Sequence, residues 1–382
     1  MPMNEHLVTA DRSVRHDLLA RTAHDAEARE RYVLSLKSLV RKEFEAGQKT
    51  LYDLKVEPDF RKKKGRAPAS IDEGRAAMKG EGFHQMWSAL TVTGQELMWD
   101  AVGESVQSDL PRIEEIARAI RRSNRKLGSL MLNPAVKMPA YVGHIDIHGQ
   151  PGGYELNETE DDVLAGALYE AGGNIYARGI GTGAHDSKAG ALIAWLRREH
   201  PGLAPKRILD IGCGVGSSTV PYAEAFPGAE VYGIDVGAGL LRYAQARAEK
   251  LGHAVHFAQQ NGEKTTYANG FFDLIVSHNL FHESPLASSR AILREAKRLL
   301  APAGLLVNLD VPAQNADRDL FQQFLGDWQT LYNAEPCWRA YAGMDLKAEL
   351  KDAGFAESRV FAIKEPKTDS AGHWQIFGAR KA

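Results

Sequence analysis

The residues best placed to do chemistry surround a glycine-rich loop in the middle of the chain. Gly212, Gly214 and Gly216 directly follow the strand-like segment RILDI. Glycines permit a tight strand-to-helix turn and let the backbone approach a ligand closely. Asp210 lies two residues before the first glycine, where a carboxylate can accept hydrogen bonds from an ammonium group. Asp235 ends the next strand-like segment, AEVYGID, where an acidic residue can hold both hydroxyls of a ribose. The pattern predicts a nucleotide-like ligand at the carboxyl ends of parallel strands.

One alternative for this loop is the dinucleotide site of an NAD-dependent oxidoreductase, which uses a similar glycine pattern. In a G-x-G-x-x-G pattern that begins at Gly212, the third glycine would fall at position 217, which is Ser217. Together with Asp210 ahead of the loop, this departure makes the oxidoreductase the poorer interpretation.

Imidazole and carboxylate side chains gather after the fourth strand-like segment, FFDLIVSH. The sequence there is His278-Asn279-Leu280-Phe281-His282-Glu283. An imidazole with an ordinary pKa near ~6.5 can accept a proton at neutral pH, and Glu283 or another carboxylate can orient it. We therefore take His282 as the candidate general base, with Glu283 and His278 as the other candidate catalytic residues. A structural or substrate-shaping role for His282 is the alternative.

Composition limits the class of protein in which these residues work. The chain has 382 residues, of which 25% are charged, and a net charge of −2. This balance disfavours a general nucleic-acid-binding surface. Cys213 and Cys337 are the only cysteines, too few for a disulfide framework or for paired metal-ligand spacing. The N-terminus lacks an apolar stretch of signal-peptide length, and no run approaches ~18 apolar residues. We expect a cytoplasmic protein without a membrane segment.

The chain divides into three parts that differ in their sequence patterns. Residues 1–140 carry helical periodicity, which predicts a mainly helical domain that caps the active site and supports a homodimer. Residues 141–200 contain a predicted hairpin, AYVGHIDIHGQPGGYEL, and a glycine-rich connection. In residues 201–382 strands alternate with helices, and an insertion occupies 311–345. This alternation predicts an α/β fold, a Rossmann-like seven-stranded and mostly parallel sheet.

In this order, the segments LDIGCGVG, YGID, FFDLIVSHNLFHE and ILREAKRLLAPAGLLVNLD resemble the class I S-adenosylmethionine-dependent methyltransferase family. The resemblance covers about residues 170–382. It implies S-adenosylmethionine as the cofactor and methyl transfer as the activity. The methionine portion would lie against Asp210 and the glycine loop, and the ribose against Asp235. The cofactor-binding residues implied by the resemblance are Tyr176, Asp210, Gly212, Cys213, Gly214, Asp235, Val236, Asn261, Gly262, Glu263, Ser277 and His278.

Within that list, Asn261, Gly262 and Glu263 would line the adenine, while Ser277 and His278 would lie near the transferring methyl group. The position of His282 is similar to the histidine of the His-Asp-Trp segment in small-molecule O-methyltransferases. Glu283 and Ser284 stand where that segment has its aspartate and tryptophan, so the match is incomplete. We expect a small-molecule acceptor and O-methylation, with N-, S- and C-methylation open.

Two further groups could contact the acceptor. Alternation along the predicted hairpin would place His144, Asp146 and His148 on one face of a strand. These are adequate metal ligands, but the solvated face of an edge strand explains them as well, and we predict no metal. Aromatic residues of the insertion, such as Phe321 and Phe324, follow helical spacing, which indicates core packing or a wall around the substrate.

The remaining alternatives concern the partner. After strand four the chain lacks the Asn/Asp-Pro-Pro-Tyr/Phe motif of enzymes that methylate planar exocyclic amines, and Ser277-His278 and Asp310-Val311 do not match metal-dependent catechol-type enzymes. The basic run at residues 61–66 indicates a solvated loop; in an RNA or protein methyltransferase it would contact the macromolecule. A cofactor-binding protein without turnover is a third hypothesis. No motif specifies the acceptor.

Overall fold

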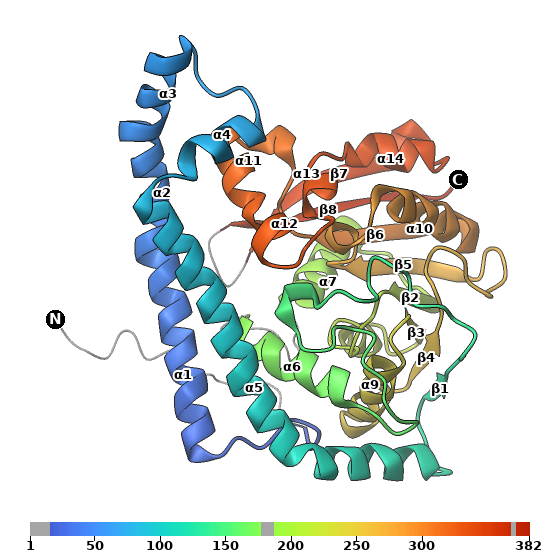
Figure 1. Ribbon diagram of the computed structural model, residues 1–382. Coiled ribbons are helices and arrows are strands. Elements are labelled where there is room, and N and C mark those ends of the chain that lie inside the picture. The colour runs from blue at the N-terminus through green and yellow to red at the C-terminus, as the bar shows by residue number, and fades with distance from the viewer. Residues whose placement is uncertain (1–15, 177–186, 368–371) are drawn as a thin grey trace.

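The structure, a computed structural model, describes residues 16–176, 187–367 and 372–382. At its centre is a sheet whose order is β1-β4-β3-β2-β5-β6-β8-β7 (Figure 1). All neighbouring pairs are parallel except those that β8 forms with β6 and β7. The strands are β1 (Ser129–Met131), β2 (Arg207–Ile211), β3 (Glu230–Asp235), β4 (Val255–Gln259), β5 (Phe272–His278), β6 (Leu300–Asp310), β7 (Val360–Pro366) and β8 (His373–Arg380).

The predicted Rossmann-like fold is confirmed, and seven of these strands are those expected from the sequence. The additional strand, β1, belongs to the region that was predicted to be mainly helical. It has three residues and pairs with the edge strand β4. Such a short segment carries no periodic signal, and its strand conformation depends on the neighbour that it joins.

Helices cover both faces of the sheet, because alternate strand residues point to opposite faces. Leu209 and Ile211 of β2 pack in the core beneath α10 (Leu286–Leu299) and α14 (Leu346–Asp352). Ile208 packs in the opposite core with α7 (Ser187–Glu199), α8 (Val220–Ala225) and α9 (Ala238–Lys250). This double covering keeps the strands in place and leaves their carboxyl ends free for a site.

The N-terminal helices lie side by side along one flank of the sheet domain (Figure 1). A rod made of α1 (His24–Leu39), the π-helical turns η1 (Val40–Glu45) and η2 (Tyr52–Val56), α2 (Ala46–Leu51) and α3 (Glu57–Lys64) leads to α4 (Ile71–Met78) and the long α5 (Gly82–Arg122). Val33 of α1 and Val102 of α5 share a core with Leu168 of α6 (Leu164–Tyr176) and Tyr243 of α9. This core attaches the helical region to the sheet domain.

A buried ion pair strengthens that attachment. Arg247 Nε of α9 donates to Glu170 Oε1 of α6 at 2.8 Å, and His16 Nε2 lies 3.1 Å from the same oxygen. Both the Arg247 and the Glu170 side chains are fully shielded from solvent. Burial raises the pKa of Glu170, but the charges of Arg247 and His16 outweigh that effect and lower it to about 2. The carboxylate is therefore ionised and holds α6, α9 and the start of the described chain together.

Two local predictions were wrong. Residues 141–157 form turns and the short helix η3 (Ile147–Gly149) rather than a hairpin. His144 and His148 have φ angles of 64° and 57°, which a strand does not allow, so the row of His144, Asp146 and His148 does not form. The basic run does not lie wholly in a loop, because residues 61–64 form the last turn of α3. Cationic side chains favour that end of a helix.

The insertion contains the short 3-10 helix η5 (Asn315–Asp317) and three short α-helices, α11 (Leu320–Gly326), α12 (Trp328–Tyr332) and α13 (Trp338–Ala342). Phe321 and Phe324 pack against Tyr52 of the helical rod, and the Trp328 ring lies 5.5 Å from that of Trp87. Core packing, one of the two predicted roles of these aromatic residues, is therefore confirmed for Phe321, Phe324 and Trp328. No helix in the described part of the chain combines the length and the apolar character needed to cross a membrane.

Candidate active site

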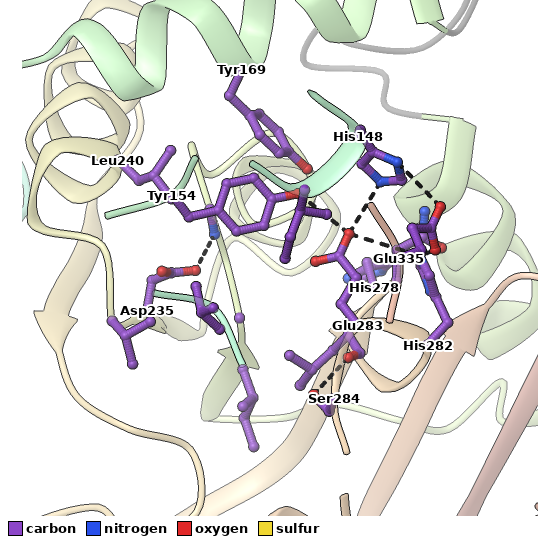
Figure 2. Close-up of a pocket in the computed structure, with 18 of the residues that line it drawn as sticks. His148, Tyr154, Tyr169, Asp235, Leu240, His278, His282, Glu283, Ser284 and Glu335 are labelled. Atoms are coloured by element: carbon purple, nitrogen blue, oxygen red, sulfur yellow. Dashed lines mark hydrogen bonds and ion pairs between the residues drawn. The ribbon is translucent and has the colours of Figure 1, made fainter. Parts of the chain in front are cut away.

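A cavity of about 510 Å³ lies at the carboxyl ends of the central strands (Figure 2). In parallel sheets this edge is where ligands bind, since the strand-to-helix turns converge there. The volume falls within the range of small-molecule sites, roughly 300–1,000 Å³. The predicted site residues that line it are Gly212, Gly214, Asp235, Val236, Asn261, Gly262, His278, His282 and Glu283.

The glycine loop bears no side chain on its cavity side and is fixed by a carboxylate. Gly212 and Gly214 have φ angles of 73° and 51°, a conformation that residues with a Cβ rarely adopt. A Cβ on Gly212 would also lie 2.8 Å from Leu280 Cδ1. The Gly214 amide donates to Asp235 Oδ2 and the Gly237 amide to Asp235 Oδ1, both at 2.9 Å. Burial raises the pKa of Asp235, and these amide donors offset part of that effect.

Asp210 lies beneath the loop rather than on the cavity wall. Thr219 Oγ1 donates to its Oδ2 at 2.6 Å, while its buried Oδ1 accepts no hydrogen bond from any described residue. His278 Nδ1 is 3.5 Å from that oxygen, and His278 Nε2 lies 3.0 Å from the Tyr222 hydroxyl. His278 is therefore held between Asp210 and Tyr222, which indicates a positioning role.

Several predicted cofactor residues point elsewhere. Ser277 Oγ donates to Asn308 Oδ1 at 2.8 Å inside the sheet. Cys213 is buried behind the loop, and its desolvation raises the pKa of the thiol well above the ordinary value. Glu263 accepts a hydrogen bond from the Tyr141 hydroxyl at 3.1 Å and does not line the cavity. Tyr176 ends α6, but its side chain and residues 177–186 of the glycine-rich connection lie outside the described structure.

The candidate base, His282, is held by a carboxylate that the sequence analysis did not assign to it. Its Nδ1 lies 2.6 Å from Asp310 Oδ1, at the end of β6. Asp310 is fixed in turn, since it accepts from the amides of Phe281 at 2.9 Å and Val311 at 2.7 Å. This arrangement directs His282 Nε2 away from Asp310, toward one end of the cavity.

At that end, two imidazoles and two further carboxylates meet (Figure 2). Glu283 Oε1 lies 3.8 Å from His282 Nε2 and 3.3 Å from His148 Nε2. Glu335, from the insertion, places Oε1 3.1 Å from His148 Nδ1 and Oε2 3.6 Å from His282 Nε2. The Tyr154 hydroxyl donates to Glu283 Oε1 at 3.3 Å. We call His148, His282, Glu283 and Glu335 the histidine–carboxylate cluster.

The cluster shifts the titration of its members. Burial lowers the pKa of His282, but Asp310, Glu335 and Glu283 outweigh it and raise the pKa to about 9. Burial raises the pKa of Glu335, but the effects of His148 and His282 are larger together and opposite, so the net shift is downward. Burial and Glu283 raise the pKa of Tyr154 well above its usual value. This environment therefore favours an imidazolium at His282, paired with the surrounding carboxylates.

Sequence reasoning missed two important residues of this end. Asp310 had a signal, because it ends a predicted strand on the edge where the site was expected. Glu335 had none, since it lies in the loop between two short insertion helices. His148 was considered as part of a strand row and instead enters the cavity from η3. Trp338 of the insertion also lines the cavity, with its ring 5.7 Å from that of His282.

Comparison with known proteins identifies the central domain. Residues 208–304 match the family model described as a methyltransferase domain. This segment contains the glycine loop, Asp235 and the turn with His282 and Glu283. The chain therefore carries a class I S-adenosylmethionine-dependent methyltransferase domain, and S-adenosylmethionine is its cofactor. The side-chain-free glycine turn and the carboxylate of Asp235 at the cavity wall fit such a group.

Curated relatives share this domain rather than the whole chain. Demethylmenaquinone methyltransferase of Thermus thermophilus is 36% identical over 126 residues, which are 32% of this chain and 56% of that protein. Trans-aconitate 2-methyltransferase of Rhodopseudomonas palustris is 34% identical over 131 residues, 31% of this chain and 46% of that protein. Malonyl-[acyl-carrier protein] O-methyltransferase of Geobacter sulfurreducens is 28% identical over 168 residues, 42% and 59% respectively. The chain thus spans about half the length of these relatives.

Solved structures give a weaker likeness. Magnesium protoporphyrin IX methyltransferase from Synechocystis has a TM-score of 0.39 and 21% identity, covering 52% of this chain and 84% of that chain. A SAM-dependent methyltransferase from Aquifex aeolicus has a TM-score of 0.35 and 22% identity, covering 46% and 82%.

Proposed function

We propose that this protein transfers the methyl group of S-adenosylmethionine to a small-molecule acceptor, with O-methylation as the reaction. One observation carries the proposal: a single cavity has the glycine loop and Asp235 at one end and the histidine–carboxylate cluster at the other. The relatives support the substrate class, since their names identify demethylmenaquinone, trans-aconitate and a malonyl carrier conjugate as methyl acceptors.

In this proposal the two ends divide the work. The cofactor lies against Gly212, Gly214 and Asp235, with its adenine beside Asn261 and Gly262. S-adenosylmethionine supplies an activated methyl group, so the protein mainly aligns the reactants and accepts a proton. The acceptor oxygen forms a bond to the methyl carbon as the carbon–sulfur bond breaks, and the electron pair of that bond stays on sulfur.

His282 is the proposed general base for the acceptor proton. Asp310 orients its ring, and Nε2 faces the cavity. Because the pKa of His282 is about 9, the ring is protonated at neutral pH, and Nε2 can accept a proton only after it has lost one. An acceptor that displaces Glu283 and Glu335 from the imidazole removes two of the three carboxylates that raise this pKa and therefore lowers it, while Asp310 stays in place. Glu283 then anchors the acceptor, while His278 stays beneath the cofactor.

The test measures S-adenosylhomocysteine formed with panels of small phenols, hydroxy acids, carboxylic acids, thiols and amines. We expect turnover with a hydroxylated or carboxylated compound and a loss of roughly 10²–10⁴-fold in His282→Ala. Turnover only when RNA or a protein fraction is added would favour the macromolecular alternative. Tight cofactor binding without turnover on any panel would favour a non-catalytic role.

We further propose that the N-terminal helices form a homodimer contact. Several large apolar side chains are exposed on this region, among them Tyr32, Leu39, Leu54 and Met86. Leu54 is the most exposed, at 78%. Sedimentation equilibrium should give a dimer in the intact chain and a weaker dimer in Leu54→Glu. A monomer at all concentrations would contradict the contact.

A further inference from the structure

We infer that His148, His282 and Glu283, with Glu335 beside them, form a binding site for one divalent transition-metal cation of the Zn²⁺ class. The site lies at the acceptor end of the cavity (Figure 2). The role of the cation rests on the proposed function, because the open coordination positions of the cation would face the bound acceptor. The binding itself follows from the geometry of the cluster.

The spacing of the donor atoms fits such an ion. His148, His282 and Glu283 each offer one donor atom, and these atoms all lie within 4.8 Å of one another. His148 Nε2 is 3.3 Å from Glu283 Oε1, and His282 Nε2 is 3.8 Å from the same oxygen. Tetrahedral Zn²⁺ with bonds of about 2.0–2.1 Å separates its ligand atoms by roughly 3.3–3.4 Å. Small side-chain movements would complete the geometry.

The support behind His282 is of the kind that metal-ligating histidines have. In metal sites the second ring nitrogen usually contacts a carboxylate, which fixes the ring and makes the ligating nitrogen more basic. Asp310 stands in that position, 2.6 Å from His282 Nδ1. It is anchored by two backbone amides, so the imidazole is held ready before any ligand arrives.

Glu335 supplies an independent observation that points to a ligand. Its side chain is 2% exposed and its Oε2 accepts no hydrogen bond among the described residues. That oxygen lies 3.6 Å from His282 Nε2. A buried carboxylate oxygen without a donor is costly unless a charge is present. A divalent cation would neutralise it together with Glu283.

The donor set also indicates which cation would bind. Two imidazoles with carboxylates suit Zn²⁺, Fe²⁺ or Mn²⁺, whereas Mg²⁺ and Ca²⁺ prefer oxygen ligands alone. Three protein ligands leave a coordination position open toward the cavity, as in catalytic rather than structural zinc sites. This position suits an acceptor with an ionisable oxygen or sulfur. With a cation bound, His282 Nε2 is a ligand, and the general-base role applies to the cation-free enzyme.

The test is titration of the metal-stripped full chain with Zn²⁺, followed by calorimetry and by metal analysis after dialysis. We expect one equivalent per chain in the wild type and an affinity loss of about 100-fold or more in His148→Ala and in Glu283→Gln. His144→Ala is the matched control, because its side chain is 92% exposed and outside the cluster; it should bind Zn²⁺ as the wild type does.

S-adenosylmethionine binding to each variant serves as the folding check. Because Zn²⁺ is titrated without cofactor or acceptor, its failure to bind would overturn the metal site and leave methyl transfer standing. Wild-type affinity in both His148→Ala and Glu283→Gln would equally overturn the site. Conversely, stoichiometric Zn²⁺ binding by a protein without any methyl transfer would contradict the proposed function alone.

Discussion

The two ends of the cavity differ in how the chain builds them. At the cofactor end, the glycine loop, Asp235, and Asn261 with Gly262 lie in successive strand-to-helix turns of one sheet. At the acceptor end, His148, Glu283 and Glu335 come from a loop before the sheet domain, a turn after β5 and the insertion. The cofactor end is thus a product of local sequence and topology, whereas the acceptor end depends on how distant segments dock.

The largest expected effect is a loss of activity from a change at the acceptor end. His282→Ala should lower turnover by roughly 10²–10⁴-fold, because the proton acceptor or metal ligand at the acceptor oxygen is lost. Cofactor affinity should stay near that of the wild type, since His282 belongs to the acceptor end. Steady-state kinetics and calorimetry on the same preparation measure both. A rate within threefold of the wild type would reduce His282 to a packing residue.

A second prediction concerns the attachment of the helical region. Glu170→Gln should destabilise the protein by about 3–5 kcal/mol at neutral pH, because Arg247 is left buried without its partner. The pKa of Glu170 is about 2 when folded against an ordinary 4.5, so its stabilisation is complete above about pH 4.5 and disappears as pH falls toward 2. Denaturant unfolding across pH checks this. A difference between variant and wild type that persists undiminished at the acid end would contradict the assignment.

A third change should affect the acceptor end from a distance. Phe324→Ala removes a ring that packs against Tyr52 and Gly74 beneath the insertion, and should cost about 3 kcal/mol of stability. Because the insertion carries Glu335, we expect weaker Zn²⁺ or acceptor binding and unchanged cofactor affinity. Phe226→Ala is a suitable comparison, since this half-buried ring lies on the opposite side of the sheet. If Phe324→Ala weakened cofactor binding as much as it weakened Zn²⁺ or acceptor binding, the distinction between the two ends would be wrong.

The smallest effect is expected in the glycine loop. Gly212→Ala forces a side chain into a φ of 73° and toward Leu280, at a cost of about 1–2 kcal/mol. Cofactor affinity should fall about tenfold by calorimetry, with Zn²⁺ binding unaltered. Gly228→Ala is the matched control, because a Cβ there meets no atom within 4 Å and its φ is not positive. Unchanged cofactor affinity in Gly212→Ala would contradict the proposal that the loop approaches the cofactor closely.

The sequence was sufficient to predict the sheet, and to predict that the glycine loop and Asp235 lie at the carboxyl ends of its strands. Apolar strands, glycine turns and the acid of Asp235 follow one another at short range, so local patterns report them. The 141–157 segment failed, because alternation resembled a strand while residues such as His148 adopt positive φ in a tertiary loop. Glu335 acquires its role only when the insertion docks near η3 and the turn after β5. No local sequence pattern encodes this contact between distant segments.

The most direct test of the account is calorimetric titration of S-adenosylmethionine into Asp235→Asn and Glu335→Gln beside the wild type. Asp235→Asn should bind the cofactor about 10–100-fold more weakly, because it loses a charged acceptor at the ribose and a clamp on Gly214. Glu335→Gln should bind it with wild-type affinity. If Asp235→Asn retained full affinity, or if Glu335→Gln lost as much, the division of the cavity into a cofactor end and an acceptor end would be wrong.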